Sequence, residues 1–465
     1  MSAAALKNAR VTVMGLGRFG GGVGAVRWLC AQGARVLVTD MAPAGDLSES
    51  LREIEALPVE LRLGGHDERD FRDADLVVVN PAVREDSPYL AAARQAGTPI
   101  TTEINLFVER RPQRAVGVTG SVGKSTTTAM IGHVLERTLS GRRVWTGGNL
   151  GGSLLGALTE IKADDVVVLE LSSFQLARIA AVSWSPAVAV VTGISPNHVD
   201  WHGDFEAYCD AKMNIVRFQG DGASLVLRDD EALAQRVARV AGGRDAWSYG
   251  LDGLTPVARL GRLGSPLASR SLRWDEAALS VPGHHNLENA AAALTVAEIL
   301  GVDAAGATAA LRSFQSLPDR MELIATIDGV RYYNDSKATT PAASITAMRS
   351  IEPPMLLILG GYDKGIDMAP AARHAATCAR YVACIGQTGP SIAAAVRAAG
   401  GEADTHPDLE SAVMACRRRA QACDSVVLSP GCASFGMFTN YRARGDAFRR
   451  IVRAAEAVRT EVGSP

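Results

Sequence analysis

Short apolar segments rich in β-branched residues alternate along the chain with longer segments rich in Ala and Leu. Strands that are covered on both faces of a parallel sheet have this apolar character, and helices connect one such strand to the next. The alternation therefore predicts an α/β fold built on parallel sheets. The strands are expected at residues 11–13, 35–38, 76–79, 115–118, 166–169, 187–191, 356–359 and 426–428.

The predicted strands fall into three groups, which indicates three domains. Breaks are expected near Arg110-Arg111-Pro112 and near Leu317-Pro318, because proline disfavours helix continuation and is common in linkers. The predicted domains are residues 1–112, 113–317 and 318–465. Residues 251–280 are rich in Gly, Arg and Ser and weakly patterned, so loops and short antiparallel strands are expected there.

The chain is close to electrically neutral. Its 465 residues include 48 Lys and Arg against 50 Asp and Glu. This balance excludes a general affinity for nucleic acid or for an anionic membrane, so neither is expected as a partner. The seven cysteines form no CxxC pair, and no apolar stretch has the length of a membrane span. We therefore expect a cytoplasmic protein without a disulfide framework or a structural zinc site.

The first glycine-rich loop follows the first predicted strand. Its sequence, Gly15-Leu16-Gly17-Arg18-Phe19-Gly20, has the GxGxxG spacing and precedes an amphipathic segment. Such glycines let backbone amides approach a diphosphate at a helix N-terminus. Asp40 ends the next predicted strand, where an acidic residue can meet a ribose hydroxyl. The pattern predicts a Rossmann-like first domain, and a nicotinamide cofactor, another nucleotide diphosphate or a packing turn would each be compatible with it.

The second glycine-rich loop follows the strand predicted at 115–118. It reads Thr119-Gly120-Ser121-Val122-Gly123-Lys124-Ser125 and leads into a helix that begins with threonines. In a phosphate loop the backbone amides surround triphosphate oxygens, the lysine neutralises their charge and the hydroxyl reaches Mg²⁺. The first glycine of the strict pattern is replaced by Val118. The strand–loop–helix context still predicts an ATP site in a central P-loop ATPase-type parallel sheet, and it argues against an NAD enzyme.

Two candidate metal ligands follow strands of the same predicted sheet. Glu170 ends the strand predicted at 166–169, and His198 follows the strand predicted at 187–191. The C-terminal ends of parallel strands meet at one edge of a sheet, so both side chains are expected near the phosphate loop. By position alone, Glu170 is equally compatible with a solvated residue at the end of a strand. Most lone histidines are structural or solvated, and it is the place of His198 at the same sheet edge that favours a functional role.

Lysine is unusually rare in this chain. Only six of the 48 basic residues are lysines: Lys7, Lys124, Lys162, Lys212, Lys337 and Lys364. A lysine kept among so many arginines can mark a position that needs a compact amine. Coding bias is the alternative explanation. Lys124, Lys212, Lys337 and Lys364 all lie in the motifs that follow.

These motifs together resemble the Mur ligases, ATP-dependent amino-acid-adding enzymes of peptidoglycan precursor synthesis. The matching segments are residues 119–126, 147–151, 169–176, 197–200, 208–212, 283–286 with Asn289, 317–320, 334–339, 359–361 with Lys364, and 429–435. They lie in all three predicted domains. The LELSSFQL, NDSKAT and SPGCASF segments resemble those of family members that add D-glutamate. The resemblance also implies a Rossmann-like α/β C-terminal domain, a monomer, and a role in cell-wall synthesis that serves cell division and cell shape.

The resemblance implies a reaction in two steps. ATP first converts the carboxylate of UDP-N-acetylmuramoyl-L-alanine to an acyl phosphate, and the amine of D-glutamate then attacks the carbonyl carbon. Contacts to ATP are implied for Gly120, Ser121, Gly123, Lys124, Ser125, Thr126, Asn286, Asn289, Arg320 and Asp335. Catalytic roles are implied for Lys124, His198, Lys212 and Lys337.

Two Mg²⁺ sites are implied as well, held by Ser125, Glu170, His198 and Lys212. Because a cationic amine cannot ligate a metal, the family carbamylates this lysine with CO₂ and so creates an anionic oxygen ligand. For the UDP-substrate we expect contacts from Gly17, Arg18, Phe19, Asp40 and Asn149. For D-glutamate, the resemblance points to Thr339, Lys364, Ser434, Phe435 and Tyr441.

Three segments depart from the pattern of the family. Val122 replaces the usual Asn of the phosphate loop, Asn80-Pro81-Ala82 replaces Ser-Pro-Gly, and residues 435–438 lack the usual acidic side chain. Several alternatives to D-glutamate addition stay open at this point. They are a sister ligase for L-alanine or a diamino acid, folylpolyglutamate synthase, an NAD-dependent dehydrogenase and a non-catalytic nucleotide-binding module.

Overall fold

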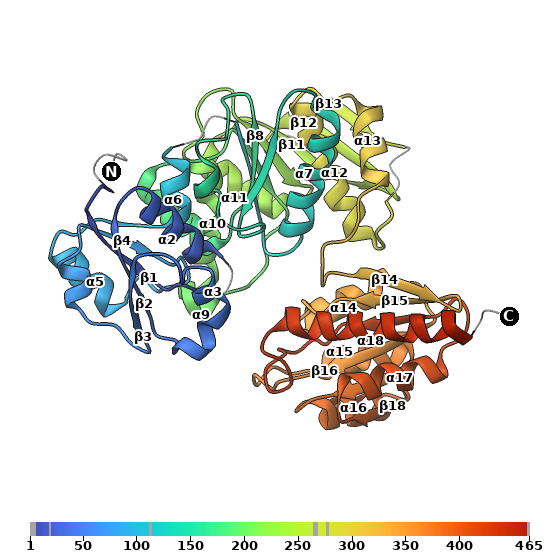
Figure 1. The fold of residues 1–465 in the computed structure, drawn as a ribbon. Helices are drawn as coiled ribbons and strands as arrows, with labels where there is room; N and C mark the ends of the chain where they lie inside the picture. The colour runs from blue at the N-terminus through green and yellow to red at the C-terminus, as the bar shows by residue number, and fades with distance from the viewer. Residues whose placement is uncertain (1–5, 18–19, 111–113, 264–267, 276–278, 463–465) are drawn as a thin grey trace. The chain divides into compact units, whose positions relative to one another are not determined.

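The structure is a computed structural model that describes residues 6–17, 20–110, 114–263, 268–275 and 279–462. Its strands form three sheets, each connected through helices (Figure 1). All eight predicted strands are present, with ends that differ by at most two residues from the predicted ones. The α/β class is therefore confirmed.

Packing divides the chain into two compact units. One consists of Met1–Ala277 with Glu288–Leu311, and the other of Ala278–Leu287 with Arg312–Pro465. The first unit contains two of the sheets, and the second contains the third. The three predicted domain boundaries stay a prediction.

The first sheet has five parallel strands in the order β3-β2-β1-β4-β5. The strands are β1 (Arg10–Met14), β2 (Arg35–Asp40), β3 (Val59–Leu63), β4 (Leu76–Val79) and β5 (Ile100–Thr101). Their helices are α2 (Gly21–Ala31), α3 (Ser48–Arg52), α4 (Arg69–Arg72), α5 (Pro88–Gln95) and α6 (Glu103–Val108). Strands β2 and β3 are added on one side of β1, and β4 and β5 on its other side, so the strand order reverses between β1 and β4. Open α/β sheets bind ligands at such a topological switch point.

The second sheet has eight strands in the order β13-β12-β11-β10-β9-β6-β8-β7. The parallel strands are β6 (Ala115–Thr119), β7 (Val144–Gly148), β8 (Val166–Glu170), β9 (Val188–Val191), β10 (Ser224–Arg228) and β11 (Asp245–Asp252). Antiparallel β12 (Thr255–Arg262) and β13 (Ala268–Arg273) extend one edge, which confirms the expectation for this region. The following helices occur along this part of the chain: α7 (Lys124–Thr138), α8 (Ser173–Ile179), α9 (Val199–His202), α10 (Phe205–Arg217), α11 (Glu231–Ala241), α12 (His284–Ile299) and α13 (Ala304–Arg312).

The third sheet has six strands in the order β14-β15-β19-β16-β17-β18, and only β14 is antiparallel to its neighbour. The strands are β14 (Glu322–Ile327), β15 (Val330–Asn334), β16 (Met355–Gly360), β17 (Ala379–Ile385), β18 (Ala403–His406) and β19 (Ser425–Leu428). The helices are α14 (Pro341–Ser350), α15 (Ala369–Cys378), α16 (Gly389–Ala398), α17 (Leu409–Arg419) and α18 (Tyr441–Val462).

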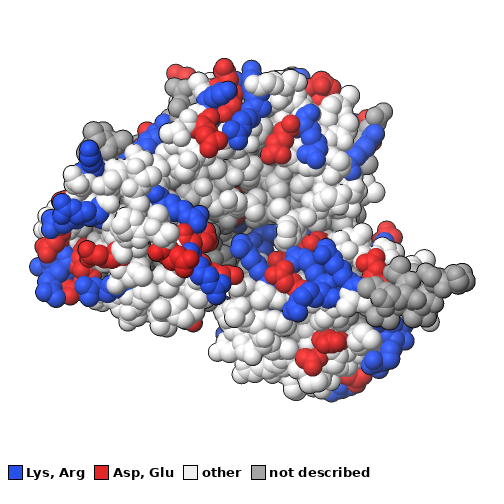
Figure 2. Space-filling view, viewed as in Figure 1, with Lys and Arg blue, Asp and Glu red and all other residues white. Residues whose placement is uncertain are grey.

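Surface charge is mixed. Acidic and basic side chains of the described residues are interspersed over the face shown in Figure 2, in keeping with a formal net charge of -2. No helix within the described ranges has the length and apolar character needed to cross a membrane.

Candidate active site

The phosphate loop connects β6 to α7 and has the conformation that its glycines allow. Gly123, with a φ of 84°, precedes the first residue of α7. A Cβ atom at Gly120 would lie 2.1 Å from the hydroxyl oxygen of Thr192, so only glycine fits there. The Ser121 amide donates to the Gly193 carbonyl at 2.8 Å. The loop is therefore held against the chain that follows β9, and it leads directly into the first turn of α7, the kind of helix N-terminus where phosphates bind.

The predicted ATP residues of the first unit surround this loop. Lys124 donates from Nζ to the Ser121 carbonyl at 3.1 Å, and Ser125 in the first turn of α7 is 3% exposed. Thr126 follows them in the same turn and is half-buried. The Asn289 Oδ1 atom accepts a hydrogen bond of 3.0 Å from Thr127, and it would lie 2.8 Å from a Cβ at Gly123. Asn289 is thus brought to the loop from far along the chain.

Glu170 ends β8, the strand next to β6, and its carboxylate is incompletely satisfied. The residue is 1% exposed, and its Oε1 accepts a hydrogen bond of 2.6 Å from Asn149 Nδ2. The Oε2 atom is buried and has no hydrogen-bond partner among the described residues. Because an unpaired buried carboxylate oxygen is costly, this atom is suited to meet a cation.

Lys212 lies on α10 and is buried against the phosphate loop. It is 1% exposed, and its Nζ donates to the Gly120 carbonyl at 2.8 Å. Burial, with a further contribution from the positive charge of Lys124, holds the pKa of Lys212 well below its ordinary value. A buried lysine that loses its proton readily has a nucleophilic amine. The side chain therefore fits the predicted carbamate chemistry.

His198 stands directly before α9 with a φ of 52°, a left-handed conformation that is uncommon for residues other than glycine. Its ring lies 4.8 Å from that of Phe174. Burial lowers the pKa of His198, the nearby carboxylate of Asp200 opposes this shift, and the charges of Lys124 and Lys212 add to it. A neutral imidazole is the form that ligates metals. In the described part of the chain, no group of three or more His, Cys, Asp or Glu side chains could hold a metal ion.

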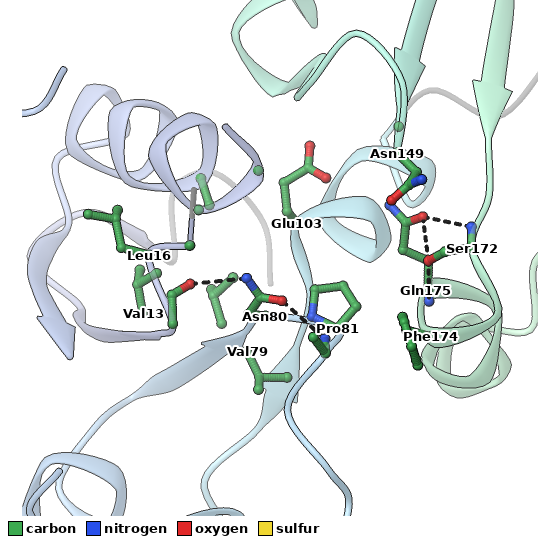
Figure 3. A pocket seen from close by; sticks show the side chains of 18 residues that line it. Val13, Leu16, Val79, Asn80, Pro81, Glu103, Asn149, Ser172, Phe174 and Gln175 are labelled. Carbon is green, nitrogen blue, oxygen red and sulfur yellow. Dashed lines mark hydrogen bonds between the residues drawn. The ribbon is translucent and has the colours of Figure 1, made fainter. Parts of the chain in front are cut away.

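A cavity of about 310 Å³ lies between the first two sheets, which belong to the same unit (Figure 3). One wall is formed by the first glycine loop, the start of α2, and the segment after β4. The opposite wall includes Asn149, Ser172, Phe174 and Gln175. The predicted residues Gly17 and Asn149 therefore line one cavity. Asn149 also donates a hydrogen bond to Glu170, so one residue connects the wall of this cavity to the candidate metal ligand.

The other residues predicted to contact the UDP-substrate are Asp40, Arg18 and Phe19. Asp40 is not among the residues that line the cavity. Its Oδ2 accepts hydrogen bonds from the backbone amides of Leu16 at 2.9 Å and Gly17 at 3.4 Å, which fixes the glycine loop. Its role at a ribose stays a prediction. Arg18 and Phe19 lie outside the described residues.

Some lining residues were not predicted from the sequence. Glu103, Phe174 and Gln175 line the cavity (Figure 3). Gln175 forms a capping box with Ser172 at the start of α8. A sequence signal existed for Phe174 and Gln175, which belong to the LELSSFQL segment, and for Glu103, which follows the helix-capping Thr102 after a short strand.

The predicted amino-acid residues gather beside the C-terminal ends of β15, β16 and β19 in the second unit. Thr339 and Lys364 line one small pocket together with residues 431–433. The Lys364 Nζ lies 5.5 Å from the centre of the Phe435 ring, and the Lys337 Nζ lies 5.3 Å from the centre of the Tyr441 ring. Ser434 follows residue 433 directly and is 4% exposed.

The remaining predicted ATP residues also belong to the second unit. Asp335, at the end of β15, accepts a hydrogen bond of 2.8 Å from Ser429. Burial raises the pKa of Asp335 to about 7, and Ser429 and the nearby Arg320 oppose this shift. Asn286 is 5% exposed and donates to the Pro282 carbonyl at 2.6 Å. Contacts of these residues with a nucleotide stay predictions.

Comparison with known proteins gives a consistent match over the whole chain. Residues 9–102 match the N-terminal domain of Mur ligases of the MurD-like type, residues 118–297 the Mur ligase middle domain, and residues 319–432 the Mur ligase glutamate ligase domain. The UDP-N-acetylmuramoylalanine–D-glutamate ligase of Roseiflexus is 40% identical over 464 residues, which cover 97% of this chain and 99% of that protein. The enzyme of the same name from Symbiobacterium thermophilum is 37% identical, over 96% of this chain and 98% of that protein.

Solved structures agree in fold. The UDP-N-acetylmuramate-alanine ligase of Thermotoga maritima superimposes with a TM-score of 0.60 at 20% identity, over 97% of this chain and 100% of that one. The MurF ligase of the same organism, in complex with ADP, gives a TM-score of 0.55 at 17% identity, over 98% of this chain and 97% of that one. Together with the full-length relatives, these matches confirm the expected family. The chain belongs to the Mur ligase family, in the group of the UDP-N-acetylmuramoylalanine–D-glutamate ligases.

Proposed function

We propose that this protein is an ATP-dependent ligase that adds D-glutamate to UDP-N-acetylmuramoyl-L-alanine through an acyl phosphate, in peptidoglycan precursor synthesis. One observation carries the proposal. Asn149 lines the cavity that would accept the UDP-substrate, and it also binds Glu170, a buried carboxylate beside the phosphate loop. The substrate carboxylate and the terminal phosphate of ATP could therefore meet next to this pair.

In the first step, a carboxylate oxygen of the UDP-substrate attacks the γ-phosphorus of ATP, and the bond to the β-phosphate oxygen breaks, releasing ADP. The amides at the start of α7 and the ammonium group of Lys124 would stabilise the phosphate charge. Both reactants are anions, so this charge stabilisation is a large part of what the protein must supply.

In the second step, the neutral amine of D-glutamate attacks the carbonyl carbon of the acyl phosphate. The carbon–oxygen bond to phosphate breaks, inorganic phosphate leaves, and the nitrogen loses a proton. For D-glutamate we propose Lys364 and Lys337 as the cations, with Thr339 and Ser434 as donors and the backbone of Phe435 and the ring of Tyr441 nearby. Two carboxylates on one small substrate need several such groups.

Mg²⁺ is proposed at two positions, with Ser125 and Glu170 as protein ligands of one and His198 and a carbamate on Lys212 as ligands of the other. The unpartnered buried oxygen of Glu170 and the buried amine of Lys212 support this assignment. When bound, Mg²⁺ would neutralise phosphate and carboxylate oxygens and so allow the two anions to approach. A cytoplasmic location and a monomeric state stay predictions.

The test is phosphate release with ATP, Mg²⁺ and UDP-N-acetylmuramoyl-L-alanine while the amino acid is varied. We expect release with D-glutamate and not with L-glutamate, L-alanine or meso-diaminopimelate. Release with L-alanine or meso-diaminopimelate but not with D-glutamate would replace the proposed specificity by that of a sister ligase. Hydroxylamine trapping tests the acyl phosphate, and an enzyme that forms product without a trappable species would contradict the two-step reaction.

A further inference from the structure

Arg444 is one of the largest fully buried side chains of the protein. It lies in the first turn of α18 and is 1% exposed. Its guanidinium donates four hydrogen bonds, all to uncharged oxygens. The Nε atom donates to Ser336 Oγ at 2.9 Å, and the two terminal nitrogens donate to the carbonyls of Ser336 and Cys432 at 2.8 and 3.1 Å. No carboxylate of the described residues accepts from it.

The two residues that accept these bonds belong to different loops. Ser336 is the second residue of the loop that follows β15, and the same loop carries Lys337 and Thr339. Cys432 lies in the loop that follows β19 and carries Ser434 and Phe435. The two loops also contact each other, because the Gly431 amide donates to the Ala338 carbonyl at 2.9 Å. Arg444 therefore bridges the two loops whose residues were assigned to D-glutamate.

The same bridge includes the start of α18. The Ser336 hydroxyl accepts from Arg444 and donates to the Tyr441 carbonyl at 2.8 Å. The first turn of α18, with Tyr441, is thus joined to the loop of Lys337. A Cβ atom at Gly361 would lie 3.3 Å from Arg444, so the loop after β16 also packs closely against the guanidinium.

Burying a guanidinium costs free energy, because the charge is removed from water and forms hydrogen bonds only to neutral acceptors here. Burial accordingly lowers the pKa of Arg444 to about 10. The guanidinium is planar and rigid, so its hydrogen bonds fix the positions of the accepting atoms relative to one another. Such precision matters most where separate loops must hold one small ligand.

We propose that Arg444 is a positioning residue for the amino-acid substrate. Its guanidinium fixes the spacing between the loop of Lys337 and Thr339 and the loop of Ser434 and Phe435. This inference rests on the proposed function, since it takes those residues as the D-glutamate site. A smaller effect is expected on nucleotide binding, because Asp335 accepts hydrogen bonds from Ser429 and from the Met321 amide, while Arg444 acts on it through charge and not through a hydrogen bond.

The test is the Arg444→Lys variant, which keeps a cation but loses the planar donors. We expect the KM for D-glutamate to rise at least tenfold, while kcat changes less than fivefold and the KM values for ATP and the UDP-substrate stay within twofold. Arg397→Lys is the matched control. Arg397 donates to the Ala403 carbonyl at 2.7 Å, on the edge strand β18, which β16 and β17 separate from β19. This variant should keep all three KM values.

A second pair of variants covers the case in which Arg444→Lys does not fold. Ser336→Ala removes only the hydroxyl that links Arg444 to Tyr441, and it should raise the KM for D-glutamate about threefold. Arg444→Ala should regain activity in millimolar guanidinium chloride, with the largest gain in affinity for D-glutamate. Circular dichroism and the thermal unfolding midpoint establish whether each variant is folded.

The outcomes distinguish a failure of the positioning role of Arg444 from a failure of the proposed specificity for D-glutamate. An unchanged KM for D-glutamate in folded Arg444→Lys or in Ser336→Ala overturns the inference, as does a parallel rise of all three KM values. If the wild-type enzyme uses another amino acid, the proposed specificity fails, and the same comparison with that amino acid tests Arg444. A wild-type enzyme that accepts no amino acid would overturn both.

Discussion

Asn149 Nδ2 donates a hydrogen bond of 2.6 Å to Glu170 Oε1, and Asn149 also lines the cavity between the first two sheets. One amide side chain thus orients a carboxylate beside the phosphate loop and contributes to the wall of the cavity that is proposed for the UDP-substrate. The Gly148 backbone approaches Glu170 as well, since a Cβ at Gly148 would lie 2.4 Å from the Glu170 carbonyl oxygen. The β7–β8 pair is therefore built to hold these residues together.

Asn149→Ala should weaken the binding of Mg²⁺ and the use of the UDP-substrate together. The variant removes a hydrogen bond to a charged group, which contributes about 1.5–3 kcal/mol, or roughly a 10- to 100-fold change. We expect a rise of this size in the Mg²⁺ concentration for half-maximal rate and a matching loss in kcat/KM for the UDP-substrate. The KM for D-glutamate serves as the internal control and should change less than twofold. A normal Mg²⁺ requirement would contradict the assigned role of Glu170.

Lys212→Arg should abolish ligation, because a guanidinium cannot form a carbamate with CO₂ and does not fit the buried position. Lys212→Ala should also be inactive but should recover partly when a short carboxylic acid is added to replace the missing oxygen ligand. The measurement is phosphate release with D-glutamate. Lys162→Arg is the matched control, because Lys162 is exposed and should tolerate the change. Activity in Lys212→Arg would refute the carbamate.

Gly120→Ala should disrupt the phosphate loop. The new Cβ would lie 2.1 Å from Thr192 Oγ1 and 2.9 Å from the Gly193 carbonyl oxygen. Relieving this overlap requires the loop to move, at a cost of about 1–3 kcal/mol in stability, and we expect ATP turnover to fall at least 100-fold. Nucleotide binding by calorimetry and the thermal midpoint measure both effects.

The control for this change is Gly156→Ala, where an added Cβ would meet nothing within 4 Å. It should keep both nucleotide affinity and stability. Tight ATP binding by Gly120→Ala would show that the loop does not contact the phosphates.

Glu103 should make the protein less stable as the pH rises. Burial raises the pKa of Glu103 from 4.5 to about 7, against a smaller opposing effect of the hydrogen bond from Ser153. Between these values the folded state keeps a proton that the unfolded chain has lost, so the free energy of unfolding falls with increasing pH. The full effect is on the order of 3 kcal/mol, present below pH 4.5 and lost above pH 7.

Glu103→Gln should remove this dependence. Calorimetric unfolding between pH 4 and 8 should give similar midpoints for the variant and the wild type at the acidic end and a more stable variant at the alkaline end. Glu109→Gln, an exposed change near the end of the same helix, should follow the wild-type profile. Parallel profiles for wild type and Glu103→Gln would show that the buried carboxyl does not titrate in this range.

The predicted strands rest on local patterns, and the structure confirms them because short runs enriched in β-branched residues are typical of strands in a buried sheet. Some of the strands that were not predicted are more polar. For example, β3 reads VELRL and is largely exposed, so its place in the sheet depends on pairing with β2 rather than on its own sequence. The loop after β6 was likewise predictable from its glycine pattern, although Gly120 is required not only by its backbone conformation but also by its contact with the distant Thr192.

The α/β class, the family and most of the candidate ligands could be predicted from the sequence, since they depend on residue types at short spacings. The three-dimensional fold was needed to find that Lys212 is buried against the Gly120 carbonyl, that Asn149 binds Glu170, and that Arg444 joins two loops. The partners in these contacts lie 92, 21, 12 and 108 residues apart along the chain. Hydrogen bonding and desolvation act through space, and no short sequence pattern specifies which distant groups will meet.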